Sequence, residues 1–408
     1  MDKIKILVIA KKVDAGYVET SNCFIKALED NNALFLDYIE LYNRYGYKGM
    51  HHYIENYIVQ NEINTVLYGS TSSEFYFDIS FFERLRRRCF LVMFTTDIEH
   101  YYEARDQYYA QAMDLVTLFD LITTFRLQQI GIQSLIIPSY YDVVRYHKIK
   151  NLVKDIDVSF NGSLYTRVGG EEYVTHLLDN NVNIELSGSG SQEGVVTTDK
   201  KIEIFNRTKV NLNFSGMGME KKDRFSRKYK TRLRIKQIKG RPWEVALCGG
   251  FVLSEYALGL EQFWEIGKEI DVFHDKEELL EKVKYYLKHD EERESIAIRG
   301  YERAKRDCDI KLAVPKLLST IDELRKKKIY KPSEIYLDDE YIRNYTTFRF
   351  FLIIRFIIKE GKWKFAIEEL KIVLKYRKLD WYQIYIFITK GIFDNSQKIK
   401  SCLKKTPN

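Results

Sequence analysis

The chain has 408 residues, too many for one hydrophobic core, so two domains with an appendage are expected. Its hydrophobic fraction of 45%, with 30 Tyr and 24 Phe but only 5 Pro, excludes a mainly disordered protein. The net charge of +7 is concentrated in residues 341–408, which hold 15 Lys and Arg against 5 Asp and Glu, so this tail carries +10 and the remainder −3.

The N-terminal part alternates short apolar runs with amphipathic segments. Its first residues, MDKIKILVIA, have no charged n-region and no cleavage site, so they predict a strand and not a signal peptide. Strands are predicted over residues 3–10, 33–41, 65–70 and 89–96, and helices over 21–31, 49–60 and 75–88. This alternation is typical of parallel strands covered on both faces. Residues 1–150 are therefore predicted to form a doubly wound, Rossmann-like α/β domain.

The same pattern restarts at residue 156. Strands are predicted over 156–164, 182–190, 209–216, 251–256 and 269–275, and helices over 169–181, 199–208, 242–250, 278–290 and 292–306. Residues 151–330 are therefore predicted to form a second doubly wound domain. Two such domains in tandem form a cleft between the carboxyl ends of their strands, and ligands are expected there.

Residues 331–408 are predicted to form a basic, aromatic-rich helical appendage. Its longest apolar stretch is interrupted by Arg349 and Arg355, so it does not meet the requirements of a membrane span. We expect this appendage to pack on the body of the protein. A peripheral contact of its basic helices with an anionic membrane stays open as the alternative.

The five cysteines, at positions 23, 89, 248, 308 and 402, have neither the spacing of a zinc site nor that of a disulfide framework. We infer a reducing, cytoplasmic location, peripheral to the inner face of a membrane if the appendage contacts lipid.

Two loops of the second domain contain glycines that follow predicted strands. GSGSQEG, residues 188–194, lacks the spacing of a dinucleotide fingerprint, so it is either a plain turn or a loop that contacts a phosphate or base. FNGSLYTR places Gly162 and Ser163 after the first strand of the domain, where backbone N–H groups can receive a phosphate. Arg167 either adds a charge-assisted contact or is solvated.

Eleven Lys and Arg residues lie between Glu220 and Arg241. Phe225 and Tyr229 are the only aromatic residues among them, and no known nucleic-acid fold surrounds the run, so nucleic acid is not expected as a partner. We expect a mobile loop whose last cations, Lys239 and Arg241, neutralise a diphosphate. The earlier cations form a solvated face or steer an acceptor.

Glu244 follows this run in the stretch GRPWEVALCGGFVLSEY, residues 240–256. A carboxylate on the first turn of a helix is favoured by the helix dipole alone. Glu244, however, stands beyond many cations and before Cys248, Gly249 and Gly250, where small residues let a ligand approach. A carboxylate there can accept hydrogen bonds from both hydroxyls of a ribose.

The same stretch and its continuation to IRGYERA, preceded by DVSFNGSL and KVNLNFSG, resembles a known family. It is similar to the group 1 domain of the spore-maturation (CgeB-like) glycosyltransferases, within the GT4-like enzymes of the GT-B superfamily. The resemblance covers about residues 156–325, and the pattern R-x-(F/W)-E-x-x-x-C-G-G carries it.

The resemblance implies a GT-B fold and a hexosyltransferase-like enzyme (EC 2.4) of glycan biosynthesis. A nucleotide-diphosphate sugar would be held mainly by the second domain, and a glycan, lipid-linked or protein acceptor mainly by the first. No metal and no cofactor are implied. Glu244 matches the acid of the family that binds the nucleotide ribose, and Arg241 matches the preceding Arg. Related enzymes often carry another Glu eight positions earlier, where this chain has Lys236, so a retaining or inverting outcome stays open.

Three ionisable residues follow the fourth predicted strand in FTTDIEHYYEARD, at the expected edge of the cleft. His100 matches the histidine of the family that contacts the reacting sugar. Alternatively, His100 is a solvated residue of the loop. Asp97 or Glu99 is the expected general base if the enzyme inverts. The spacing Asp-Ile-Glu differs from the Asp-x-Asp of metal-dependent glycosyltransferases, which agrees with the absence of a metal.

A glycosyltransferase is thus the favoured function. The alternative is a non-catalytic GT-B-like protein that acts as an interaction or nucleic-acid-binding protein through its basic segments.

Overall fold

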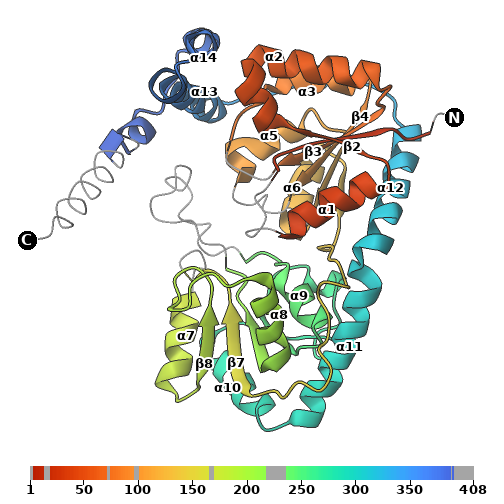
Figure 1. Ribbon diagram of the computed structural model, residues 1–408, viewed down its shortest axis with the longest axis vertical. Helices are drawn as coiled ribbons and strands as arrows, with labels where there is room; N and C mark the ends of the chain where they lie inside the picture. The colour runs from red at the N-terminus through yellow and green to blue at the C-terminus, as the bar shows by residue number, and fades with distance from the viewer. Residues whose placement is uncertain are drawn as a thin grey trace, which may run out of the picture.

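The computed structural model describes residues 3–12, 19–70, 74–95, 101–164, 170–216, 236–386 and 388–389. Two lobes stand one above the other, and each has a parallel sheet with helices on both faces (Figure 1). The prediction of two doubly wound α/β domains is therefore confirmed.

The first sheet has six parallel strands in the order β2-β1-β3-β4-β5-β6. The strands are β1 (Ile6–Ala10), β2 (Leu34–Asp37), β3 (Thr65–Ser70), β4 (Phe90–Thr95), β5 (Leu115–Leu118) and β6 (Ser134–Ile136). Its helices are α1 (Glu19–Asp30), α2 (Tyr38–Gln60), α3 (Ile79–Arg86), the π-helix η1 (Tyr102–Asp106), α5 (Gln107–Ala110) and α6 (Leu121–Gln129). Apolar side chains fill both faces of the sheet and form two separate cores.

The strand predicted over 33–41 is too long, because its second half is helical. The Asp37 carboxylate accepts hydrogen bonds from the backbone N–H groups of Ile39 at 2.8 Å and Glu40 at 3.1 Å. This N-cap ends β2 and starts α2. The predicted helix over 49–60 is the second part of α2, which is broken at Gly46, where φ is +71°.

The second sheet has five parallel strands in the order β11-β10-β9-β7-β8. They are β7 (Ile156–Asn161), β8 (Ile184–Ser187), β9 (Thr208–Asn213), β10 (Val252–Glu255) and β11 (Asp271–Phe273). The accompanying helices are α7 (Gly170–Asp179), α8 (Thr198–Arg207), α9 (Arg241–Leu247), the 3₁₀-helix η4 (Leu260–Gln262), α10 (Lys276–Tyr286) and α11 (Asp290–Cys308).

Two chain segments connect the lobes and are hydrogen-bonded to each other. The Tyr141 N–H donates to the Cys308 carbonyl at 2.9 Å, and the Ile310 N–H donates to the Tyr141 carbonyl at 3.0 Å. After this bridge, α12 (Ile310–Lys326) returns to the first lobe (Figure 1) and buries Val314 and Ile321 in the core formed with β1 and α1. The domain limits at residues 150 and 330 stay predictions.

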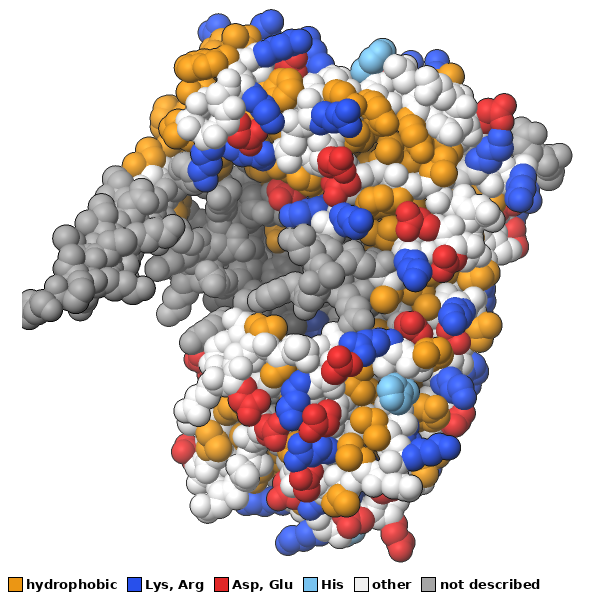
Figure 2. Space-filling view, in the orientation of Figure 1, with side chains coloured by type: hydrophobic (Ala, Val, Ile, Leu, Met, Phe, Trp, Pro, Cys, Tyr) orange, Lys and Arg blue, Asp and Glu red, His pale blue; other side chains and the backbone are white. Residues whose placement is uncertain are grey.

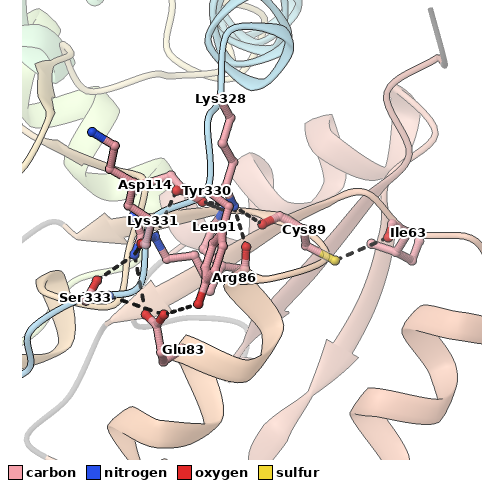
Figure 3. Close-up of polar contacts among 10 residues, drawn as sticks. All are labelled: Ile63, Glu83, Arg86, Cys89, Leu91, Asp114, Lys328, Tyr330, Lys331 and Ser333. Atoms are coloured by element: carbon pink, nitrogen blue, oxygen red, sulfur yellow. Dashed lines mark hydrogen bonds and ion pairs between the residues drawn. The ribbon is translucent and has the colours of Figure 1, made fainter.

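The segment after α12 is fastened to the first lobe by polar contacts (Figure 3). The Lys328 ammonium donates to the carbonyls of Arg86 at 2.5 Å and Cys89 at 2.6 Å and pairs with Asp114 at 2.8 Å. The Arg86 guanidinium also pairs with Asp114, at 2.9 Å. The Tyr330 hydroxyl donates to Glu83 at 2.7 Å. These contacts fix the path of the chain toward the tail.

The described part of the tail packs on the first lobe, as favoured from the sequence. It comprises α13 (Asp339–Ile354), the π-helix η5 (Arg355–Glu360) and α14 (Trp363–Tyr376). Tyr341, Leu352 and Ala366 contribute to the core on the α2 and α3 side of the first sheet. Among the described residues, no helix is both long and apolar enough to cross a membrane.

A fully buried ion pair lies at this junction. The Arg349 guanidinium donates to Glu369 Oε2 at 3.0 Å and to the carbonyls of Phe75 at 2.7 Å and Tyr76 at 3.0 Å. The Tyr42 hydroxyl donates to Glu369 Oε1 at 2.5 Å. The arginine that interrupts the apolar stretch therefore joins α13 to α14 and both helices to the first lobe.

Replacing Arg349 with Met should lower the stability of the full chain strongly. The change leaves the Glu369 carboxylate buried without its ion-pair partner, which costs about 3–5 kcal/mol. Urea unfolding followed by circular dichroism measures the loss. The double variant Arg349→Met/Glu369→Met should lose less than the single variant, because it removes both charges. Arg343→Met, on the same helix but half-exposed, is the control, and an equal midpoint for this control and Arg349→Met would contradict a stabilising pair.

Candidate functional site

The candidate site lies where the carboxyl edges of the two sheets face each other. In the second sheet the connections leave β7 and β9 in opposite directions, and such a switch point opens a crevice beyond the strand ends. A Cβ on Gly259, after β10, would lie 2.9 Å from the Leu121 side chain, which follows β5 of the first lobe. The two carboxyl edges therefore approach one another.

Arg241 and Gly162 meet at the switch point of the second sheet. Arg241 is the first residue of α9, and its guanidinium lies 5.0 Å from the centre of the Phe160 ring. A Cβ on Gly162 would lie 2.5 Å from Arg241 Nη2, so the guanidinium occupies space that any other residue at 162 would fill. Ser163 follows directly. The structure thus brings Gly162 and Arg241 together, and the contact of these residues and of Ser163 with a phosphate stays a prediction.

The loop GSGSQEG packs against this position. Gly188 has a φ of +117°, and a Cβ there would lie 2.3 Å from the Gly162 carbonyl oxygen. The Gly188 N–H donates to the Gly194 carbonyl at 2.7 Å, which closes the loop on itself. The loop is therefore a tight turn that packs against the backbone of Gly162. A contact of this loop with a phosphate or base stays a prediction.

Glu244 lies one turn after Arg241 and is held by two donors. Its Oε1 accepts hydrogen bonds from Lys201 Nζ at 2.8 Å and from the Tyr146 hydroxyl at 3.1 Å. The Glu244 side chain is 12% exposed and that of Lys201 is 19% exposed. Both donors contact the same oxygen, so they fix the plane of the carboxylate. Neither Lys201 nor Tyr146 was identified from the sequence.

The start of α9 is also packed against the segment that joins the lobes. A Cβ on Gly240 would lie 2.3 Å from the Tyr141 hydroxyl oxygen. Burial, together with the Glu244 carboxylate, raises the pKa of Tyr141 well above its usual value, so this hydroxyl stays neutral at physiological pH. The connection between the lobes therefore contacts the candidate site directly.

The remaining predicted donor-site residues have contacts within the protein. Lys239 is mostly buried, and its ammonium donates to Gln237 Oε1 at 2.8 Å. Gly249 has a φ of +69°, and a Cβ there would lie 2.9 Å from Lys148. A Cβ on Gly250 would lie 2.8 Å from Asn211. The two glycines thus serve the turn from α9 into β10, and their contact with a ligand stays a prediction.

Lys236 occupies the position where related enzymes carry a glutamate, and it pairs with a different carboxylate. Its ammonium lies 3.1 Å from Oε1 of Glu255, a buried residue at the end of β10. Glu255 Oε2 accepts from the backbone N–H groups of Ser215 at 2.8 Å and Gly216 at 3.0 Å. Glu255 was missed in the sequence because it ends a strand whose other residues are apolar, with the exception of Ser254.

Several predicted site residues lie outside the described part of the chain. These are Asp97, Glu99, His100, Arg167 and residues 217–235 of the basic run. Their roles stay predictions. Within the described ranges, no three His, Cys, Asp or Glu side chains form a group that could hold a metal ion.

Gly188→Ala should destabilise the protein more than Gly194→Ala. Both positions have positive φ, which costs a residue with a Cβ about 1–2 kcal/mol. Only at Gly188 would the new Cβ collide with backbone, since nothing lies within 4 Å of the corresponding position at Gly194. Thermal melting of both variants measures the difference. Equal melting temperatures would contradict the close packing of this loop on Gly162.

Comparison with known proteins agrees with this architecture. Residues 163–318 match a family model described as glycosyl transferase-like. No curated protein sequence gives a significant match. The structure is similar to sucrose-phosphate synthase from Thermosynechococcus elongatus, with a TM-score of 0.58 and 11% identity over 79% of this chain and 100% of that one.

Two further solved structures show the same likeness. Anabaena HepE in complex with UDP has a TM-score of 0.57 and 14% identity, over 78% of this chain and 100% of that one. A glycosyltransferase from Rickettsia africae has a TM-score of 0.55 and 11% identity, over 80% of this chain and 100% of that one. At these identities the likeness concerns the fold. Residues 163–318 thus match a glycosyl transferase-like family, and the two lobes together have the GT-B fold of glycosyltransferases.

Proposed function

We propose that the protein is a glycosyltransferase that moves a sugar from a nucleotide-diphosphate donor to a hydroxyl acceptor without a metal ion. The observation that carries the proposal is the pairing of Arg241 with Gly162 at the switch point, with Glu244 one turn away along α9. The family match of residues 163–318 and the GT-B fold support it. HepE, one of the similar proteins, was crystallised with UDP and with UDP-glucose.

The diphosphate of the donor would be bound by positively charged side chains, and its ribose by hydrogen bonds. The diphosphate carries negative charge that increases as the sugar leaves, and Arg241 and Lys239 are the cations assigned to it. Because Gly162 has no side chain and that of Ser163 is short, phosphate oxygens could approach the backbone N–H groups there. Glu244 would accept the two ribose hydroxyls, with Lys201 and Tyr146 holding the carboxylate in place. Arg167 would add a further cation.

The acceptor would be held mainly by the first lobe. His100 is assigned to the reacting sugar, and Asp97 or Glu99 is the base that removes the proton from the attacking hydroxyl if the enzyme inverts. The acceptor is a glycan, a lipid-linked sugar or a protein. We further propose the CgeB-like subtype, a hexosyl donor, a role in glycan biosynthesis and a cytoplasmic location.

Glu244→Gln should weaken the binding of nucleoside diphosphates by at least about 10-fold. Hydrogen bonds to a charged group contribute about 1.5–3 kcal/mol, and the neutral amide loses that contribution. Calorimetric titration of the full chain with several nucleoside diphosphates in the presence of EDTA measures it. Glu291→Gln, at an exposed acid in the first turn of α11, is the matched control. Binding of none of the nucleotides to the unaltered chain, or equal affinity in Glu244→Gln, would overturn the donor site.

If the enzyme inverts, either Asp97→Asn or Glu99→Gln should slow sugar transfer by on the order of 10²–10⁴, the usual contribution of a general base. Nucleotide affinity should be preserved, because the base acts on the acceptor and not on the donor. Steady-state turnover with a nucleotide sugar, together with the calorimetric titration, separates the two effects. Asp30→Asn, at the end of α1, is the control. If both single variants kept full turnover, neither Asp97 nor Glu99 would be the general base.

A further inference from the structure

One apolar stripe of α14 is exposed along the whole helix. Its side chains recur every three or four residues and therefore lie on one face. They are Trp363, Ile367, Leu370 and Leu374, which are 60%, 51%, 43% and 56% exposed. Ile358, before the helix, and Trp381 and Tyr385, after it, are also strongly exposed. Apolar side chains of this size rarely form a continuous exposed row without a partner.

Lysines line one edge of the stripe. Lys364, Lys371 and Lys375 are exposed, and the helical repeat places all three on the same side of the row. The opposite edge, with Ala366 and Val373, is buried against the protein. In Figure 2, hydrophobic and basic side chains lie together over the region of α13 and α14.

The acidic residues of α14 offset only part of this charge, because Glu368 is the one partly exposed carboxylate against three exposed lysines. Glu369 is buried in the ion pair with Arg349. Glu368 is half-buried and accepts a hydrogen bond from the Lys48 N–H at 3.4 Å. The exposed part of the helix is therefore apolar in the centre and positively charged along its free edge.

We propose that this face docks the protein on an anionic lipid surface. The docking face is defined as the apolar residues Trp363, Ile367, Leu370 and Leu374 with the lysines Lys364, Lys371 and Lys375. A helix that lies in the plane of a membrane has this arrangement, in which apolar side chains enter the acyl boundary and lysines contact the anionic headgroups. Indole rings prefer the same interface, which suits Trp363 and Trp381.

The shape of the face favours lipid over a protein partner. The stripe is a ridge on one helix and not a groove, and a stable protein interface buries about 800 Å² on each partner. The long lysine side chains can extend along the helix and keep their ammonium groups at the level of the headgroups. The net positive charge along the edge matches a surface of uniform negative charge.

The tail is held firmly enough to transmit this contact to the first lobe. Arg349 and Glu369 fix α13 and α14 to each other, and Arg349 also bonds the backbone of the first lobe at Phe75 and Tyr76. Docking would therefore hold the first lobe near the lipid surface. If the proposed function is correct, the lobe assigned to the acceptor is the one brought to the membrane, which favours a lipid-linked acceptor.

Vesicle sedimentation of the full chain tests the proposal. The chain should sediment with vesicles of phosphatidylcholine mixed with phosphatidylglycerol, much less with phosphatidylcholine alone, and less as salt is added. Ile367→Glu/Leu370→Glu should weaken binding by at least about 10-fold, because charges would enter the acyl boundary. Changing Lys364, Lys371 and Lys375 to Glu should weaken it by on the order of 100-fold, since each lysine near the surface contributes about a factor of five.

Matched controls lie on the second lobe. Ile298→Glu alters an exposed apolar residue of α11, 55% exposed, and changing Lys284, Lys288 and Lys305 to Glu gives the same change in net charge. Both should bind vesicles as the unaltered chain does. Equal sedimentation with neutral and anionic vesicles, or undiminished binding by the two α14 variants, would overturn the proposal. Self-association that these variants abolish, without vesicle binding, would also overturn it and make the face an interface between copies. No nucleotide is needed, so the result is independent of the donor-site test.

Discussion

The bridge at Tyr141 is the contact on which the geometry of the site depends. The two segments that join the lobes are paired there by backbone hydrogen bonds to Cys308 and Ile310. The Tyr141 side chain packs on Gly240 at the start of α9, and the same segment continues to Tyr146, which bonds Glu244. A change in the angle between the lobes would therefore act directly on the residues assigned to the nucleotide. In a two-lobed protein such a contact couples the connection between the lobes to the candidate site.

Much of the fold could be predicted because the apolar periodicity is strong and local. Most strands of the two sheets and most helices between them follow from runs of apolar residues, although β5 and β6 were not predicted. Other errors lie at boundaries such as Asp37, where a side-chain cap decides the outcome. The helix α12 was not among the predicted helices, and the sequence pattern does not reveal that the chain returns to the first lobe there. Such a crossover is a property of tertiary packing.

The candidate site was predictable only in part, for a physical reason. Arg241, Glu244 and Gly162 stand in short segments whose composition is unusual, so the sequence draws attention to them. Lys201 is one of two adjacent lysines on an amphipathic helix, and only the rotation of α8 determines that it faces Glu244. Glu255 has no local signature, because its partners come from the segment after β9, from α7 and from the segment at Lys236. Charges paired across distant segments leave no local pattern in the chain.

The contacts of Glu255 have a consequence for two segments that stand apart in the sequence. One buried carboxylate holds Gly216 and Lys236, and these two residues also form an isolated antiparallel bridge. Loss of this carboxylate would leave two backbone N–H groups and one ammonium without this acceptor. A single substitution at the end of β10 would therefore act on both segments at once.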